Sequence, residues 1–270
     1  MSCISRSAVF LSLLLCGCAS NTIDQSPVLE YEVVGSGDQV VLFDAGSLSG
    51  MAGWDSIWGS LPDNITAIRY SRRGEGGSSN CTGQLTVDDY VDDLEDLLVK
   101  LDVQSPFVYV AHSLGAIVSR AYSARNPGQV SAMLLLDPPN PRDLEIKMTV
   151  DEVRGGAEIQ RVRAEDYQAG SGKWCFLDVI WDKSRPPGFA EMGDLPVTQI
   201  AGVKKVENPQ RIFDSDKAKR LWGLYQSEWV NEFPRGRALV SERSGHFVQD
   251  DEPELVIKEL TRLLDSLAEN

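Results

Sequence analysis

The stretch between residues 107 and 122 constrains the fold most. Residues 107–110 form a short apolar run of aromatic and β-branched residues, which predicts a buried strand. Residues 116–122 continue at helical spacing, which predicts a helix. Between them, residues 111–115 read Ala-His-Ser-Leu-Gly and place Ser113 at a sharp turn. Such a turn lifts the serine hydroxyl out of the sheet edge and directs the free N–H groups of the helix start toward it.

Ser113 is therefore a candidate nucleophile. The stretch departs from the motif G-x-S-x-G only at its first position, where Ala111 is small enough to let strand and helix approach. Taken alone, the pattern is also consistent with a serine that merely caps the helix. Because a serine hydroxyl is a poor nucleophile without a base, the nucleophile interpretation requires a histidine elsewhere in the chain.

The chain contains two histidines, His112 and His246. His246 follows the apolar run 238–240 and precedes an amphipathic segment that begins near residue 254. A loop between a last strand and a C-terminal helix is the expected place for the base, in the chain order serine, acid, histidine. We interpret His246 as the base for Ser113; a structural histidine is the alternative.

With these features, the chain resembles the α/β hydrolases, in particular esterase-like members that carry a cap. The resemblance covers residues 29–270 and rests on the serine turn, on residues 69–78 and on residues 244–253. Residues 69–78 resemble the segment D-R-x-G-x-G-x-S, with Ser71 where aspartate is usual. The resemblance implies an α/β fold, in which helices cover both faces of a mostly parallel sheet, and a short helical cap inserted at about residues 140–194.

Pattern and composition agree with this fold. The chain has 270 residues, 42% of them hydrophobic and 24% charged, which fits one globular domain at residues 29–270. Apolar strand patterns alternate with helical patterns, as is typical of a parallel sheet. We expect strands at residues 29–34, 39–43, 65–69, 107–110, 130–136, 197–202 and 238–240, and helices at 54–61, 87–101, 116–122, 215–229 and 253–267.

A buried carboxylate is needed to orient the histidine ring and to stabilise it when it is protonated. By the resemblance, the acid can stand at the carboxyl end of the earlier strand, where Asp137 follows residues 130–136, and the carboxyl edge of a parallel sheet faces the ligand crevice, so we expect Asp137 in this role. Glu207 is the second candidate, since the resemblance usually places the acid after the strand at 197–202. The alternatives are a turn residue before proline for Asp137 and a surface charge for Glu207.

Two backbone N–H groups are expected to stabilise negative charge next to Ser113. Leu114 supplies one of them at the start of the helix. By the resemblance, the other lies after the strand at residues 39–43, where Gly46 lets the chain turn and Ser47 follows. Leu48 is the alternative donor to Ser47, and a plain β-turn is the alternative for the whole loop.

The residues and the resemblance together predict a serine hydrolase that cleaves a carboxylic ester or related acyl bond of a small molecule through an acyl-enzyme. This mechanism needs no cofactor, and no spacing of histidine, cysteine and carboxylates suggests a metal site. Amidases, peptidases, thioesterases and lactonases would use the same residues. A non-catalytic binding or scaffold lipoprotein is the competing class.

Residues 1–17 predict the signal peptide of a bacterial lipoprotein. An apolar run at residues 8–15 is too short to span a membrane and ends in Leu-Cys-Gly-Cys, which resembles a lipobox with Cys18 as the lipidated residue. Residues 18–28 would then be a tether. Ala19 suggests, by resemblance, retention at the outer membrane of the cell envelope, facing the periplasm. The alternative is cleavage near residue 20, which would give a secreted protein.

Charge and cysteine usage add two expectations. A formal net charge of −14 argues against nucleic acid or anionic lipid as a partner. Once the cysteines at 3, 16 and 18 are assigned to the signal and the lipid, Cys81 and Cys175 remain. In an oxidising compartment they could form a disulfide between the loop after the strand at residues 65–69 and the cap. Two unrelated thiols are the alternative.

Overall fold

The computed structural model describes residues 27–182 and 193–269. The predicted signal peptide, Cys18 and nearly all of the tether lie outside these residues, so they stay predictions. Within the described part of the chain, no helix has both the length and the apolar character needed to cross a membrane.

A single sheet forms the centre of the described structure, with seven strands in the order β1-β3-β2-β4-β5-β6-β7. β1 pairs antiparallel with β3, and the remaining neighbours pair in parallel. The strands are β1 (Tyr31–Gly35), β2 (Gln39–Asp44), β3 (Ile65–Tyr70), β4 (Phe107–His112), β5 (Val130–Leu136), β6 (Val197–Gly202) and β7 (Gly236–Ser241). The predicted fold class is confirmed, and each predicted strand lies within a few residues of an observed one.

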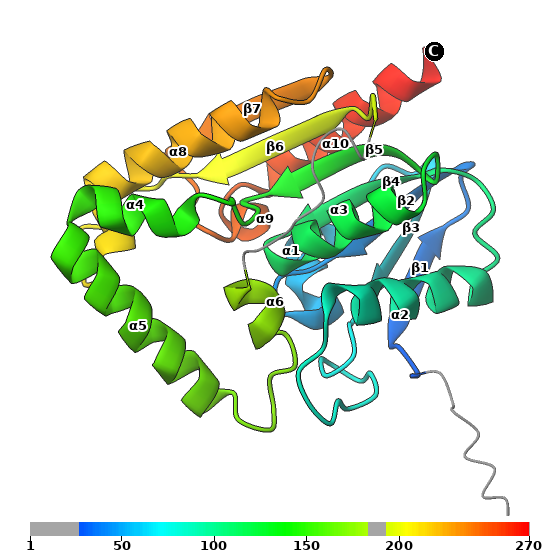
Figure 1. Ribbon diagram of the computed structural model, residues 1–270. Coiled ribbons are helices and arrows are strands. Elements are labelled where there is room, and N and C mark those ends of the chain that lie inside the picture. The colour runs from blue at the N-terminus through cyan, green and yellow to red at the C-terminus, as the bar shows by residue number, and fades with distance from the viewer. Residues whose placement is uncertain (1–26, 183–192, 270) are drawn as a thin grey trace, which may run out of the picture.

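Helices cover both faces of the sheet (Figure 1). One face carries α2 (Val87–Lys100), α3 (Leu114–Arg125) and α8 (Asp216–Val230); the other carries η1 (Gly50–Trp54), α1 (Asp55–Trp58), α9 (Val248–Asp251) and α10 (Pro253–Ala268). β4 shows why both faces are apolar: Phe107 and Tyr109 pack into one core, and Val108 and Val110 pack into the other. Side chains alternate between the two faces of a strand, so a strand buried on both sides reads as a continuous apolar run.

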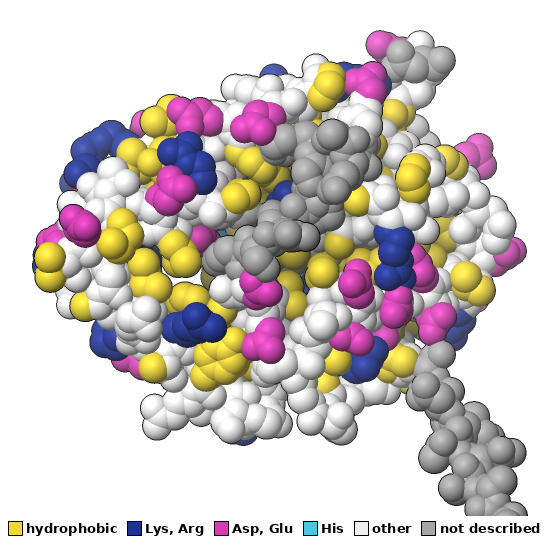
Figure 2. Space-filling view, in the orientation of Figure 1, with side chains coloured by type: hydrophobic (Ala, Val, Ile, Leu, Met, Phe, Trp, Pro, Cys, Tyr) yellow, Lys and Arg dark blue, Asp and Glu magenta, His cyan; other side chains and the backbone are white. Residues whose placement is uncertain are grey.

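The predicted cap region contains three described helices, α4 (Asp143–Val150), α5 (Glu152–Ala169) and α6 (Leu177–Trp181). They lie beyond the carboxyl ends of the parallel strands (Figure 1). In the space-filling view of Figure 2, the surface is hollowed beside α5. Hydrophobic side chains lie at the border of the hollow. Residues 183–192 of the predicted cap lie outside the described residues.

A disulfide joins Cys81, in the loop after β3, to Cys175, just before α6, with 6.3 Å between the two Cα atoms. The same two segments are also joined by hydrogen bonds: the Leu85 N–H donates to the Cys175 carbonyl (2.7 Å), and the Gln84 amide donates to the Trp174 carbonyl (2.6 Å). The cap region is thus tied to the body of the domain at this point.

Candidate active site

Ser113 lies at the turn between β4 and α3, with φ 47° and ψ −117°. Few non-glycine residues adopt such a conformation, and where it occurs the surrounding structure enforces it. Gly115 makes the turn possible, because a Cβ at this position would lie 2.3 Å from the Asp44 carbonyl oxygen. The Ser113 N–H donates to the carbonyl of Leu136 (3.1 Å), which fixes the turn against β5. The serine is thus held at the carboxyl edge of the sheet.

Three predicted residues from three separate segments meet at this edge. His246 Nε2 is 3.0 Å from Ser113 Oγ, and His246 Nδ1 is 2.6 Å from Asp137 Oδ2. An ionised carboxylate can only accept a hydrogen bond, so Nδ1 carries the proton and the lone pair of Nε2 faces the hydroxyl. In this arrangement His246 can take the proton of Ser113, and Asp137 can stabilise the charged ring that results.

Asp137 is buried, with 5% of its surface exposed, and its carboxylate is firmly held. Its Oδ1 accepts hydrogen bonds from the Gly202 N–H (2.9 Å) and from Trp222 Nε1 (2.7 Å), which leaves Oδ2 to face His246. Glu207 instead lies exposed on the loop after β6, and the partner of His246 Nδ1 is Asp137. The structure therefore brings Asp137, the first candidate, to the histidine, and leaves Glu207 at the surface.

The loop that carries His246 is organised by two acidic residues that the sequence analysis did not single out. Ser244 Oγ and Arg243 Nε donate to the Glu252 carboxylate (2.5 and 2.7 Å), and the Gly245 N–H donates to Asp251 (2.7 Å). Burial alone would raise the pKa of Glu252, but hydrogen bonds from the hydroxyls of Ser241 and Ser244 and from Arg243 outweigh burial and lower it. An ionised Glu252 therefore fixes the segment that leads into His246.

The candidate oxyanion donors are backbone N–H groups of Leu114 and of the loop after β2. Leu114 is the first residue of α3, and the N–H groups of a first helical turn have no partner inside the helix. In the loop after β2, the Leu48 N–H donates to Glu75 Oε1 (3.0 Å), so that group is already occupied. Of the two alternatives in this loop, Ser47 is left as the candidate.

A buried charge cluster holds the loop that contains Ser47. Arg72 donates to the carbonyl oxygens of Ala45 (2.6 Å) and Gly46 (2.9 Å), and its guanidinium is paired with the carboxylates of Asp44 and Glu75. Burial would lower the pKa of Arg72, but the two carboxylates raise it above its ordinary value, so the cation persists. Arg72 and Glu75 belong to the segment 69–78 that carried the resemblance, yet their contact with this loop was not predicted.

A cavity of about 250 Å³ is lined by Ser113, Asp137 and His246. Its remaining walls are mostly apolar and come from the cap region, η2 (Ile212–Asp214) and α8; they include Leu144, Ile180, Trp181, Phe213 and Trp222. Lys147 and Asp143 add charged groups, and the Lys147 ammonium lies 3.1 Å from Glu158. The cavity can therefore surround a small, largely apolar group next to the serine.

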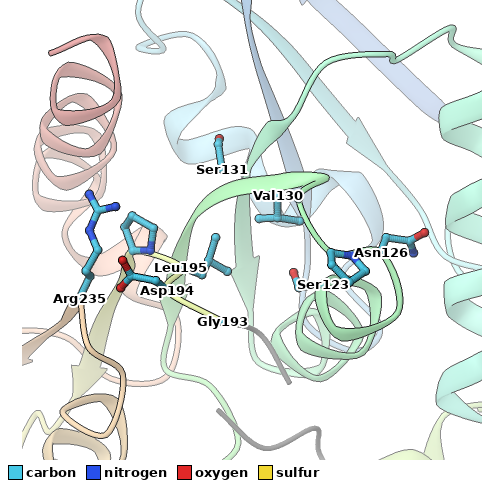
Figure 3. Close-up of a pocket in the computed structure, with 11 residues that line it drawn as sticks. Ser123, Asn126, Val130, Ser131, Gly193, Asp194, Leu195 and Arg235 are labelled. Atoms are coloured by element: carbon cyan, nitrogen blue, oxygen red, sulfur yellow. The ribbon is translucent and has the colours of Figure 1, made fainter. Parts of the chain in front are cut away.

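A second cavity, of about 460 Å³, opens at the amino ends of β5 and β6, where Figure 3 shows Ser123, Val130, Leu195 and Arg235 around it. This is the sheet edge opposite to Ser113. None of the candidate residues lines this cavity. We assign it no part in the chemistry.

His112, the residue before Ser113, predicts a pH dependence of stability. Burial and the neighbouring His246 lower the pKa of His112 to about 3, from an ordinary value near 6.5. Between these two values the unfolded chain binds a proton at this position and the folded chain does not. Acidification through this window therefore destabilises the fold, by up to about 1.4 kcal/mol for each pH unit.

His112→Gln removes this titration. Urea unfolding at about pH 7 and about pH 5 measures the effect, and the acid-induced loss of unfolding free energy should be roughly 2 kcal/mol smaller in the variant. Equal losses in both proteins would show that His112 does not stay neutral in the folded chain.

Comparison with known proteins shows the family of this chain. A sequence profile of the alpha/beta hydrolase family matches residues 41–259. The chain belongs to the α/β hydrolase family. This hydrolase is 30% identical over 235 residues to the Bacillus subtilis (strain 168) protein YqjL, described as uncharacterized, with 87% of each chain covered. It is 24% identical to the 2-(acetamidomethylene)succinate hydrolase of Mesorhizobium japonicum, with 86% of this chain and 90% of the relative covered.

Solved structures share the fold of this α/β hydrolase. A carboxylesterase structure from the thaumarchaeon Nitrososphaera gargenis superposes with a TM-score of 0.65 at 21% identity, covering 92% of this chain and 98% of the other. A thermophilic esterase from Thermogutta terrifontis gives a TM-score of 0.62 at 18% identity, covering 88% and 93%. The family expected from the sequence is thus confirmed, and with it the broad class of hydrolase.

Proposed function

We propose that this hydrolase cleaves carboxylic esters, or closely related acyl bonds, with Ser113 as nucleophile, His246 as base and Asp137 as the acid that orients His246. One observation carries the proposal: the hydroxyl, the imidazole and the carboxylate are in hydrogen-bond contact in series, at 3.0 and 2.6 Å. Acyl transfer requires a serine hydroxyl that is aligned with a base, whereas ligand binding alone does not.

The first half of the reaction forms an acyl-enzyme. Ser113 Oγ attacks the carbonyl carbon of the ester while His246 Nε2 takes the hydroxyl proton. The N–H groups of Ser47 and Leu114 stabilise the negative charge on the carbonyl oxygen. The carbon–oxygen bond to the alcohol then breaks, and the alcohol leaves with the proton returned by His246.

The second half releases the acid. Water attacks the acyl carbonyl with His246 again as base, and the bond to Ser113 Oγ breaks as His246 returns the proton to it. Since 48% of the His246 side chain is exposed, water can reach the ring from outside. The products are the carboxylic acid and the free enzyme.

Hydrolysis of p-nitrophenyl esters tests the proposal. The cavity of about 250 Å³ favours short acyl chains, so we expect kcat/KM to be highest for acetate or butyrate and to fall steeply for the palmitate ester. His246→Ala, the matched control, should lower kcat by roughly 10³-fold or more. A folded wild type no faster than its His246→Ala variant on every ester would favour a binding protein instead.

We also propose that the mature protein is attached to the bacterial cell envelope through lipid on Cys18 and faces the periplasm. The apolar run at residues 8–15 and the Leu-Cys-Gly-Cys sequence that follows support this proposal. A disulfide between Cys81 and Cys175 also fits an oxidising compartment. Metabolic labelling with palmitate tests it, because incorporation into the wild type should be lost in Cys18→Ala, and an unlabelled wild type would contradict it.

A further inference from the structure

His112 makes close contact with the candidate base. It is buried, with 1% of its surface exposed, and its Nε2 lies 2.8 Å from the carbonyl oxygen of His246. Its ring centroid is 4.7 Å from that of His246 and 5.3 Å from that of Phe247. His112 therefore contacts both the backbone and the ring of His246, although neither residue is near the other in sequence.

The contact determines the protonation of the His112 ring. A carbonyl oxygen only accepts hydrogen bonds, so Nε2 must carry the proton and Nδ1 must present a lone pair. Within the described residues, Nδ1 is buried without a hydrogen-bond partner. A Cβ at Gly46 would lie 2.7 Å from this same atom, so the ring also packs against the loop that carries Ser47.

An apolar residue would fill this space without leaving a buried nitrogen unpaired, which is unfavourable. What histidine adds is the donor at Nε2. That donor reaches the backbone of the residue whose ring must stay between Ser113 and Asp137. If His112 served only to fill space, its hydrogen bond to His246 would have no explanation.

We propose that His112 is a positioning residue, whose Nε2–H holds the His246 carbonyl so that the His246 ring stays aligned with Ser113 Oγ and Asp137 Oδ2. The inference rests on the proposed function, because alignment of His246 matters only if His246 acts as a base. His112 touches no reacting atom in this role. The lowered pKa of about 3 supports it, since a neutral His112 places no second positive charge beside His246 when that ring takes a proton.

Three substitutions of His112 distinguish the effect of its Nε2–H donor from the effect of the volume of its ring. His112→Gln places an amide N–H near the position of Nε2, His112→Asn places it near Nδ1, and His112→Leu removes it. With p-nitrophenyl acetate, and with the rate of labelling by a fluorophosphonate probe, we expect the Asn and Leu variants to be slower by roughly 10- to 100-fold in kcat. KM should change by less than about threefold, and the Gln variant should keep most of the wild-type rate.

Two results would overturn the inference. A Leu variant as fast as the wild type would mean that the donor has no effect. A Gln variant as slow as the Leu variant would mean that His112 acts only by filling space. A wild type that neither hydrolyses the ester nor reacts with the probe is a different failure, because it removes the proposed function itself.

Nuclear magnetic resonance gives a test on the wild-type protein. This test depends neither on the folding of a variant nor on enzyme activity. The chain contains two histidines, so the ¹⁵N signals of both imidazole rings can be resolved and assigned. At about pH 5 we expect one ring to be neutral with its proton on Nε2, which identifies His112. A spectrum in which neither ring is neutral with its proton on Nε2 at this pH would contradict the inference, whatever the enzyme hydrolyses.

Discussion

Ser113→Ala is expected to lower kcat for ester hydrolysis by roughly 10⁴- to 10⁶-fold, because it removes the oxygen that forms the acyl-enzyme. KM should change little, since the substitution removes one oxygen and leaves the walls of the cavity in place. Steady-state kinetics on the preferred p-nitrophenyl ester measures both quantities. A Ser113→Ala variant that keeps more than a tenth of the activity would exclude Ser113 as the nucleophile.

Ser113→Gly is the matched control for folding. At φ 47° a side chain strains the backbone, and glycine removes that strain. We expect this variant to be inactive yet at least as stable as the wild type in urea, with a gain of about 1 kcal/mol. Loss of activity together with unchanged or increased stability would show that the hydroxyl, and not the fold, has been lost.

Asp137→Asn is expected to lower kcat by roughly 10³- to 10⁴-fold. Asparagine has nearly the same shape, and its oxygen can still accept from the Gly202 N–H and from Trp222 Nε1, at 2.9 and 2.7 Å in the wild type. The amide NH₂ group of the asparagine then donates a hydrogen bond to His246 Nδ1. Nδ1 must therefore be unprotonated, and the ring proton moves to Nε2. His246 in that tautomer can no longer accept the proton of Ser113.

Glu207→Gln is the control for Asp137→Asn, since it removes the charge of the other candidate acid. Glu207 lies exposed on the loop after β6, so we expect its loss to change kcat by less than about twofold. The opposite pattern, with Glu207→Gln inactive and Asp137→Asn active, would mean that a different loop conformation supplies the acid in the working enzyme.

Local signals in the sequence predicted the strands, and together with the family resemblance they predicted the three residues that converge at the edge of the sheet. The strand and helix around Ser113 have distinct periods, and the change between them falls at the serine. Asp137 was predicted from its place at the end of a parallel strand, where side chains meet those of neighbouring strands. The strand and turn patterns are contained within single segments, and the chain order of the resemblance links those segments into one site.

The residues that support the site could not be predicted, because their contacts join distant segments without a periodic pattern. Trp222 contributes one N–H to Asp137 across 85 positions of the chain. Ser47 and Leu48 could not be separated, because the choice depends on which N–H Glu75 binds, 27 positions away. The roles of Arg72 and His112 likewise depend on backbone carbonyls that only the folded chain brings to them.

The most direct test of the central claim is the intact mass of the purified protein after reaction with a fluorophosphonate probe, followed by mapping of the modified peptide. The probe reports an activated serine without the natural substrate being known. We predict one adduct for each chain on the peptide that contains Ser113, no adduct in Ser113→Ala and strongly slowed labelling in His246→Ala. An unmodified wild type that is folded, or an adduct on a different serine, would contradict the assignment of Ser113 as the nucleophile.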